Sequence, residues 1–377
     1  MNKLIIITFV FVFICYIYVS YVENDLKVLE NDMYNNVENF TVFRDNNFKY
    51  PSQKLKEYKG NNLNSYDDKT DFDKSLQINK YYKNIDDDLL LTKDQFVQPK
   101  SQDFFTLYNI MKTTYLNYMS DINVYARNAK NINVLIAKYE KCCTQILNKE
   151  IVIFNNNLKK MYQSRINNYL KEWLDSMLKK IKIVKGATWL EDGMPHTHGE
   201  FIIFNPSMFV SFQPSTFIHE LTHVHQRIIP REYHKLYRLW GFHYYNIKEI
   251  KGFEQIVKRN RSNPDGMDCN WILKNVCKGR DYWIGAVFNS NTPNSLSACY
   301  LEAYPLVTKD DGTIVYENEK PESIPQFDDF KKLFCVSSNH YHPNEIVAQY
   351  MEYYFNSKKL KCKNYNIFVE WFENLEY

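Results

Sequence analysis

The sequence predicts an α+β protein in which a mainly helical region precedes a region of mixed strands and helices. Residues 103–184 contain no Pro or Gly and repeat apolar residues at spacings of three and four, which predicts three or four helices. After Gly186, short strand-like runs alternate with Pro and Gly turns and with helix-length patterns. We therefore predict a helical region at 101–185 and a second domain at 186–377.

The first hundred residues contain two further segments. Lys3 precedes an apolar run from Leu4 to about Val19, which is typical of a secretory signal and is short of the roughly 20 residues that span a bilayer. We predict a signal peptide or an uncleaved signal anchor at 1–22. The protein is then secreted, vacuolar or lumenal, and contacts a membrane only through this segment. Residues 23–100 are polar and broken, as in a linker or a pro-segment.

The charge of the chain is nearly balanced. Lys and Arg number 47 and Asp and Glu number 44, which gives a formal net charge of +3. A surface that binds nucleic acid usually carries a strong basic field. We therefore expect no nucleic-acid partner. The length of 377 residues is enough for one large domain or two ordinary ones, and so for a buried site.

Eight cysteines bear on the compartment and on metal binding. Cys15 lies in the predicted signal, and the number that remains is odd. In an oxidising compartment we expect two or three disulfides, with Cys269 and Cys277 as the preferred local pair. No CxxC occurs in the sequence, so a zinc cluster built from cysteines is disfavoured.

A predicted strand and the helix after it carry the main motif. Phe201 to Phe204 form an apolar run that a Pro turn ends, which predicts a strand. The following segment, QPSTFIHELTHVHQRII, offers a helix start at Ser215 or Thr216, a helix-length apolar pattern and a stop at Pro230.

The helix presents two imidazoles and a carboxylate at a spacing that suits a metal ion. Residues four apart lie one turn apart on the same face, so His219 and His223 can bind one ion. Glu220 follows the first histidine directly, which turns its carboxylate away from ligation and towards a metal-activated water, where it can act as general base. Zinc lowers the pKa of such a water to about 7.

The stretch TFIHELTHV resembles the active-site helix of the zincin metallopeptidases. That pattern favours Thr or Val at Thr216 and uncharged residues around the two histidines. His225 departs from it, since the family usually has an apolar residue there. The metzincin subclass is excluded, because Gln226 and Ile229 stand where its Gly and its third His would be. The chain therefore resembles the gluzincins, which take a third ligand from a Glu on a later helix.

The segment HPNEIVAQYMEYYF matches the gluzincin pattern NExxA. Asn344, Glu345 and Ala348 fill its three positions, so the resemblance implies that Glu345 is the third zinc ligand. Glu302, in CYLEAYPL, is the competing carboxylate, and His342 is a less suitable candidate. The long segment between the two ligand helices must then form a subdomain.

The resemblance also implies where a substrate would lie. In zincins the free edge of a strand beside the cleft pairs with an extended peptide, and residues 196–204 are the matching segment here. His196 is a candidate for contact with metal or substrate. A donor to the developing oxyanion usually comes from the later half of a gluzincin site. The candidates for this role are Tyr341, His342, His340, Tyr304 and Tyr300.

Over residues 186–355, the segments PHT, HELTH with HQR, NPD and HPNE resemble uncharacterised zincin-like proteins of protists and large viruses. The resemblance implies a zincin-like catalytic domain with one zinc per chain and a peptide or protein substrate, most simply an endopeptidase. Two alternatives stay open. In the first, the chain is a catalytically inactive zincin-fold protein with a binding or structural role. In the second, the zinc is structural and the helical region is the functional module.

Overall fold

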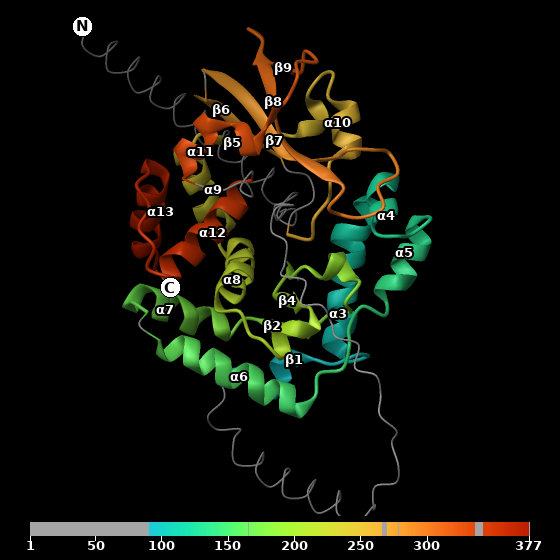
Figure 1. Cartoon of the computed structure of the whole chain (residues 1–377), viewed down its shortest axis with the longest axis vertical. Coiled ribbons are helices and arrows are strands. Elements are labelled where there is room, and N and C mark those ends of the chain that lie inside the picture. Colours follow the sequence, from blue (N-terminus) through green and yellow to red (C-terminus); the bar gives the residue numbers. More distant parts are fainter. Residues whose placement is uncertain (1–89, 165, 266–269, 278, 336–341, 377) are drawn as a thin grey trace, which may run out of the picture. The chain divides into compact units, whose positions relative to one another are not determined.

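The computed structural model describes residues 90–164, 166–265, 270–277, 279–335 and 342–376 (Figure 1). The predicted signal segment, most of the predicted polar segment and the residues His340, Tyr341 and Cys269 lie outside them. Within these ranges, every helix is too short or too polar to cross a bilayer.

Four strands from distant parts of the sequence form one sheet in the order β1-β2-β4-β3. β2 pairs in parallel with both β1 and β4, and β3 closes the edge as the antiparallel strand. All four residues of β4 are buried, so both faces of the sheet are covered. The strand predicted at Phe201 to Phe204 is confirmed. The strands are β1 (Phe96–Val97), β2 (Lys182–Lys185), β3 (His196–His198) and β4 (Phe201–Phe204).

β2 corrects two predictions from the sequence. Its residues continue the helical pattern of the segment before it, and we expected them at the end of a helix. Ile183 and Val184 are both buried because neighbouring residues of a strand point to opposite faces of a sheet that is covered on both sides. The predicted domain boundary at residue 186 runs through this sheet, so the helical region and the later part of the chain share a sheet and a core.

The region before β2 contains five described α-helices, more than the three or four predicted. Ser120, Asn131 and Asn167 each begin a new helix, because their side chains accept a hydrogen bond from a backbone NH in the first turn. A continuous apolar pattern does not reveal such caps in an Asn-rich chain. The helices are α3 (Gln102–Ile110), α4 (Asp121–Ala126), α5 (Ile132–Tyr139), α6 (Asn148–Gln163) and α7 (Asn168–Leu178), and a π-helical turn (Met111–Tyr115) follows α3.

The helix that contains HELTH is α8 (Pro214–Ile228). It begins at Pro214 and not at a Ser215 or Thr216 cap, because proline lacks the NH that the first helical position leaves unpaired. Pro230 ends α8 as predicted and at once begins α9 (Pro230–Leu239). The residues from Phe217 to Gln226 are all buried, so α8 is a central helix of the core.

The segment between the two ligand helices was expected to form a subdomain, but its buried residues belong to the same hydrophobic core as α8. Its main element is an antiparallel sheet in the order β10-β8-β7-β6-β5, with β9 paired to β8. Its elements are β5 (Phe242–Tyr244), α10 (Glu254–Arg259), β6 (Trp271–Cys277), β7 (Arg280–Phe288), β8 (Cys299–Thr308), β9 (Ile314–Val315) and β10 (Glu322–Ser323).

Three helices end the chain, and the middle one packs along α8. Figure 1 shows α12, in red-orange, beside the yellow-green α8. α12 begins at Pro343, and Ala348 is fully buried in it. The three are α11 (Asp328–Phe334), α12 (Pro343–Phe355) and α13 (Lys363–Glu373). Short 3-10 helices lie at Lys93–Gln95, Leu116–Tyr118, Leu190–Gly193, Pro206–Phe209, Ile247–Glu249 and Ile324–Gln326.

Candidate metal centre

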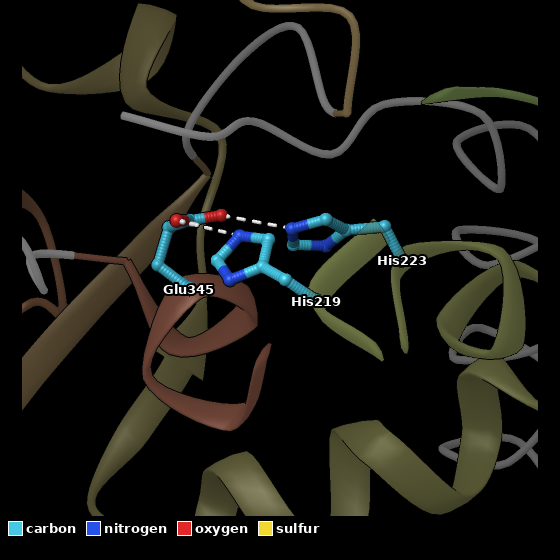
Figure 2. Close-up of side chains that lie close together, drawn as sticks. All are labelled: His219, His223 and Glu345. Atoms are coloured by element: carbon cyan, nitrogen blue, oxygen red, sulfur yellow. Dashed lines mark ion pairs between the residues drawn. The ribbon is translucent and has the colours of Figure 1, made fainter. Parts of the chain in front are cut away.

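The packing of α8 against α12 brings His219, His223 and Glu345 together. Figure 2 shows both imidazoles projecting from α8 towards the carboxylate of α12. One ligand atom from each of the three residues lies within 4.8 Å of the others, and all three side chains are buried. The three residues that the sequence suggested as ligands therefore form a group that could hold a metal ion.

The spacing of the ligand atoms suits a single small ion. The Nε2 of His219 lies 3.5 Å from Oε2 of Glu345, and the Nε2 of His223 lies 3.1 Å from Oε1. Zinc bonds to nitrogen and oxygen are about 2.0 Å long, which puts neighbouring ligands of a tetrahedral site about 3.3 Å apart. Two imidazoles and a carboxylate are also ligands that zinc commonly takes in open sites.

Two atoms of this group have no hydrogen-bond partner. The Nε2 of His223 and Oε1 of Glu345 face each other at 3.1 Å and make no hydrogen bond, although both side chains are at most 2% exposed. A buried polar atom without a partner is costly. A cation between the two atoms would satisfy the lone pairs of both, so these residues fit a metal ion.

The far sides of both imidazoles are held by other side chains. The Nδ1–H of His219 donates to Oε1 of Glu352 at 2.6 Å, and that of His223 donates to Oε1 of Gln226 at 2.8 Å. Gln226 in turn donates to the backbone oxygen of Asn344 at 3.0 Å, which ties α8 to α12. With the proton on Nδ1, each Nε2 keeps its lone pair for a metal.

The sequence reasoning missed Glu352 and Gln226. Glu352 lies seven residues after Glu345, and Gln226 lies three after His223, so helical spacing places each near the face that carries the ligand. That spacing was the available signal. It was weak because Glu and Gln are also ordinary residues of exposed helix faces.

Electrostatic attraction couples the three residues to one another. Burial raises the pKa of Glu345, but the two imidazoles outweigh this and lower it to about 2. Burial lowers the pKa of His219, but Glu345 and Glu352 raise it well above its ordinary value. Protons and a metal ion thus compete for the same imidazoles, and metal binding releases protons.

The other residues suggested from the motif lie beside this group. Glu220 is buried next to His219 on α8. His342 caps the start of α12, where its Nδ1 accepts from the backbone NH of Asn344 at 3.2 Å. Burial lowers the pKa of His342 to about 3, so its ring is neutral. The nearby charge of Glu345 raises this pKa, but by less than burial lowers it. His342 is therefore a neutral polar neighbour of the site.

His196 lies on β3, outside the group of three. Its Nδ1 donates to the backbone oxygen of Met194 at 2.9 Å, and its buried Nε2 has no hydrogen-bond partner. The remaining candidates are far along the chain on β8. Glu302 accepts a hydrogen bond from the hydroxyl of Tyr304, which packs in the core of the six-stranded sheet, and Tyr300 is exposed.

The free edge of β3 is covered, contrary to the expectation that a substrate strand pairs there. The backbone NH of Thr197 donates to Oδ1 of Asp265 at 3.0 Å, and its backbone oxygen accepts from Nη2 of Arg227 at 3.2 Å. Asp265 and Arg227 also form an ion pair at 3.1 Å. A peptide adding to β3 at this point would have to displace both side chains.

His225, the departure from the zincin pattern, packs in the core beneath α8. Its Nδ1 forms a hydrogen bond of 2.7 Å with the hydroxyl of Tyr233, and its ring lies edge to face with Trp173. Burial, and to a smaller extent Lys180, lowers the pKa of His225 to about 3. The ring is thus neutral and replaces the expected apolar residue without placing a charge in the core.

Fold and site together define an α+β protein with a buried His/His/Glu group that could hold one metal ion. A scan against protein-family models finds no match to this chain, and searches of curated proteins and of solved structures find none either.

Glu352→Gln is expected to lower metal affinity by about 10-fold to 100-fold, since a charged partner of a metal-binding histidine raises its basicity and fixes its orientation. Titration with zinc in competition with a chelator measures this. The control is Glu370→Gln, at an exposed position of α13. Equal affinities of the two variants would show that Glu352 does not support His219.

His225→Gln is expected to make the fold more tolerant of acid. The unfolded chain binds a proton at His225 below about pH 6.5, whereas the folded chain does so only near pH 3. The free energy of unfolding therefore decreases as the pH is lowered from 6.5 towards 3. The loss is about 1.4 kcal/mol per pH unit. Glutamine keeps a polar group and removes the titration.

Urea unfolding of both proteins at pH 7.0 and pH 4.5, with a chelator present, measures the difference. Asn366→Gln, at an exposed position of α13, is the control, because it removes no titrating group. The idea fails if wild type and His225→Gln lose the same stability on acidification.

Proposed function

We propose that this protein is a zinc-dependent metallopeptidase of the gluzincin type. The observation that carries the proposal is the group of His219, His223 and Glu345, in which two imidazoles one turn apart on α8 meet a carboxylate from α12. Three protein ligands leave a fourth position for water, as in catalytic zinc sites. A structural site would have four protein ligands, and the described residues supply three.

Each residue has a separate task in this proposal. His219, His223 and Glu345 would hold zinc, which lowers the pKa of a water to about 7. Glu220 would act as general base, taking a proton from the attacking water and passing it to the amine that leaves the cleaved peptide bond. Glu352 and Gln226 hold the two imidazoles in position through their Nδ1–H groups. His342 and His196 are candidates to contact substrate, and Tyr341 is a candidate donor to the oxyanion.

The proposed substrate is a peptide or protein, and the proposed compartment is the secretory pathway. The apolar segment at 1–22 supports the second point, as a signal peptide or an anchor. Neither proposal includes a nucleic-acid partner, since the net charge is only +3.

The experiment compares Glu220→Gln with wild type on a library of quenched fluorescent peptides. We expect wild type to bind about one zinc per chain and to cleave some peptides. Glu220→Gln should keep the zinc and lose at least about 100-fold in rate, because a general base contributes that much. Glu254→Gln, at the exposed start of α10, is the matched control. Full activity of Glu220→Gln would refute the mechanism.

One observation favours a second candidate, a zinc-binding protein of the same type without peptidase activity. Asp265 and Arg227 occupy the strand edge that a peptide would use. A wild-type protein that binds zinc and cleaves no peptide of the library would support this candidate.

A further inference from the structure

Two cysteines lie at the facing ends of two helices that pack together. Cys335 ends α11, and Cys362 precedes the first residue of α13. α11 and α13 are in contact. Helix ends that face each other place side chains from distant parts of the sequence close together. Here they do so for two thiols that the sequence did not suggest as a pair.

The hydroxyl of Tyr350 lies between the two cysteines. It donates to the backbone oxygen of Phe334 at 2.6 Å, and this carbonyl belongs to the peptide bond that leads to Cys335. The same hydroxyl lies 4.0 Å from Sγ of Cys362. The hydroxyl of Tyr350 thus contacts the residue before Cys335 and the sulfur of Cys362.

The backbone at Cys335 gives a second reason to look for a role of its side chain. Its φ of 49° lies in the left-handed region, where an L side chain is disfavoured and where glycine is the usual residue after a helix. A cysteine in this position is explained if its sulfur forms a bond. Observed backbone strain of this kind supports such a hypothesis about a site.

The surroundings of the two sulfurs differ in a way that suits pairing. Cys362 is 7% exposed, whereas Cys335 is half-buried and accessible to an exchange partner. Burial, followed by the neighbouring Cys362 thiol, raises the pKa of Cys335 to about 12. Such a thiol is protonated at neutral pH, which makes it a poor metal ligand and slows thiol exchange in the folded protein. The bond would therefore form while the chain folds, before Cys335 is buried.

We propose that Cys335 and Cys362 form a disulfide when the protein folds in an oxidising compartment. Both thiols are free in the structure, and the bond forms by exchange with an oxidised disulfide such as glutathione disulfide. The S–S bond of the partner breaks, the new S–S bond forms, and the two electrons and two protons of the cysteines leave as two partner thiols. The proposal does not depend on peptidase activity, but it rests on the secretory compartment proposed above, where disulfides form.

The bond would close a loop from 335 to 362 that contains the whole of α12. A cross-link stabilises mainly by restricting the unfolded chain, and the restricted segment here is the one that carries Glu345 and Glu352. The disulfide would therefore hold the carboxylate side of the metal centre against α8.

The test is peptide mapping of the full chain after folding in a glutathione redox buffer, with free thiols alkylated before any reduction. The expected result is a linked peptide that contains Cys335 and Cys362 and disappears on reduction. Alkylation of both cysteines in the unreduced sample would overturn the proposal, and so would a link from either one to another cysteine.

The stability of substituted proteins gives a second test of the same bond. Dithiothreitol should lower the urea midpoint of wild type by more than it lowers that of Cys335→Ser, because any other disulfide is reduced equally in both proteins. Cys299→Ser is the control, because Cys299 lies on β8, away from the proposed bond. Dithiothreitol should lower the urea midpoint of this variant as much as it lowers that of wild type. A wild-type midpoint that ignores dithiothreitol would contradict the proposal. If Cys335→Ser does not fold, the mapping of wild type decides alone.

Discussion

Glu345→Ala is expected to lower the zinc affinity of the protein by more than about 100-fold, because loss of a residue that only supports a ligand already costs 10-fold to 100-fold. The substitution removes the single carboxylate that faces both imidazoles, at 3.5 Å from His219 and 3.1 Å from His223. The fold should survive, because two buried histidines remain on one helix and can stay neutral.

Competition with a chelator of known affinity measures the loss, and circular dichroism checks the fold. Glu370→Gln, at an exposed position of α13, should bind zinc as wild type does. If Glu345→Ala bound zinc as tightly as wild type does, Glu345 would not be a zinc ligand and α12 would not belong to the metal centre.

Arg127→Met is expected to destabilise the protein by about 3 to 5 kcal/mol, since it leaves the carboxylate of Glu191 buried without its partner. The two side chains form a double hydrogen bond, at 2.9 Å from Nε and 2.8 Å from Nη2, and both are 3% exposed. Arg127 also donates to the backbone oxygen of Ser262 at 2.9 Å. Arg127 therefore ties the end of α4 to the 3-10 helix at Leu190–Gly193 and to the loop that contains Ser262.

Urea unfolding measures the effect, and a second variant tests its cause. Arg127→Met combined with Glu191→Gln should be more stable than Arg127→Met alone, because no charge is then left buried. The surface pair of Arg280 and Glu319 is the control. Its side chains are 39% and 41% exposed, so Arg280→Met should cost less than about 1 kcal/mol. Equal losses for the two arginines would contradict the argument.

The parts of the site that could be predicted are those that local spacing determines. His219, Glu220 and His223 follow from one turn of a helix, and the structure has them on α8. Glu345 needed a resemblance to a family, because nothing in a single helix indicates which other helix faces it. The strand at β4 was predictable from its continuous apolar run.

The parts that could not be predicted depend on long-range contacts. β2 has the same residue types as the helix before it, and only its pairing with β1 and β4 makes it a strand. Asp265 lies in the NPD segment, for which the sequence predicted no contact, and it is fully buried with its carboxylate bound by Thr197 and Arg227. Each of these contacts joins segments many residues apart, and sequence patterns carry no record of them.

The order of the ligands along the chain also has a consequence for synthesis. The two histidines of α8 are made long before α12, with the six-stranded sheet between them. Contacts between such distant segments form slowly, because closing a long loop costs conformational entropy before the favourable contacts can form. A growing chain would thus offer a metal ion only two ligands until its last helices dock. The zinc content of a preparation would then measure the fraction of molecules in which α12 has docked against α8.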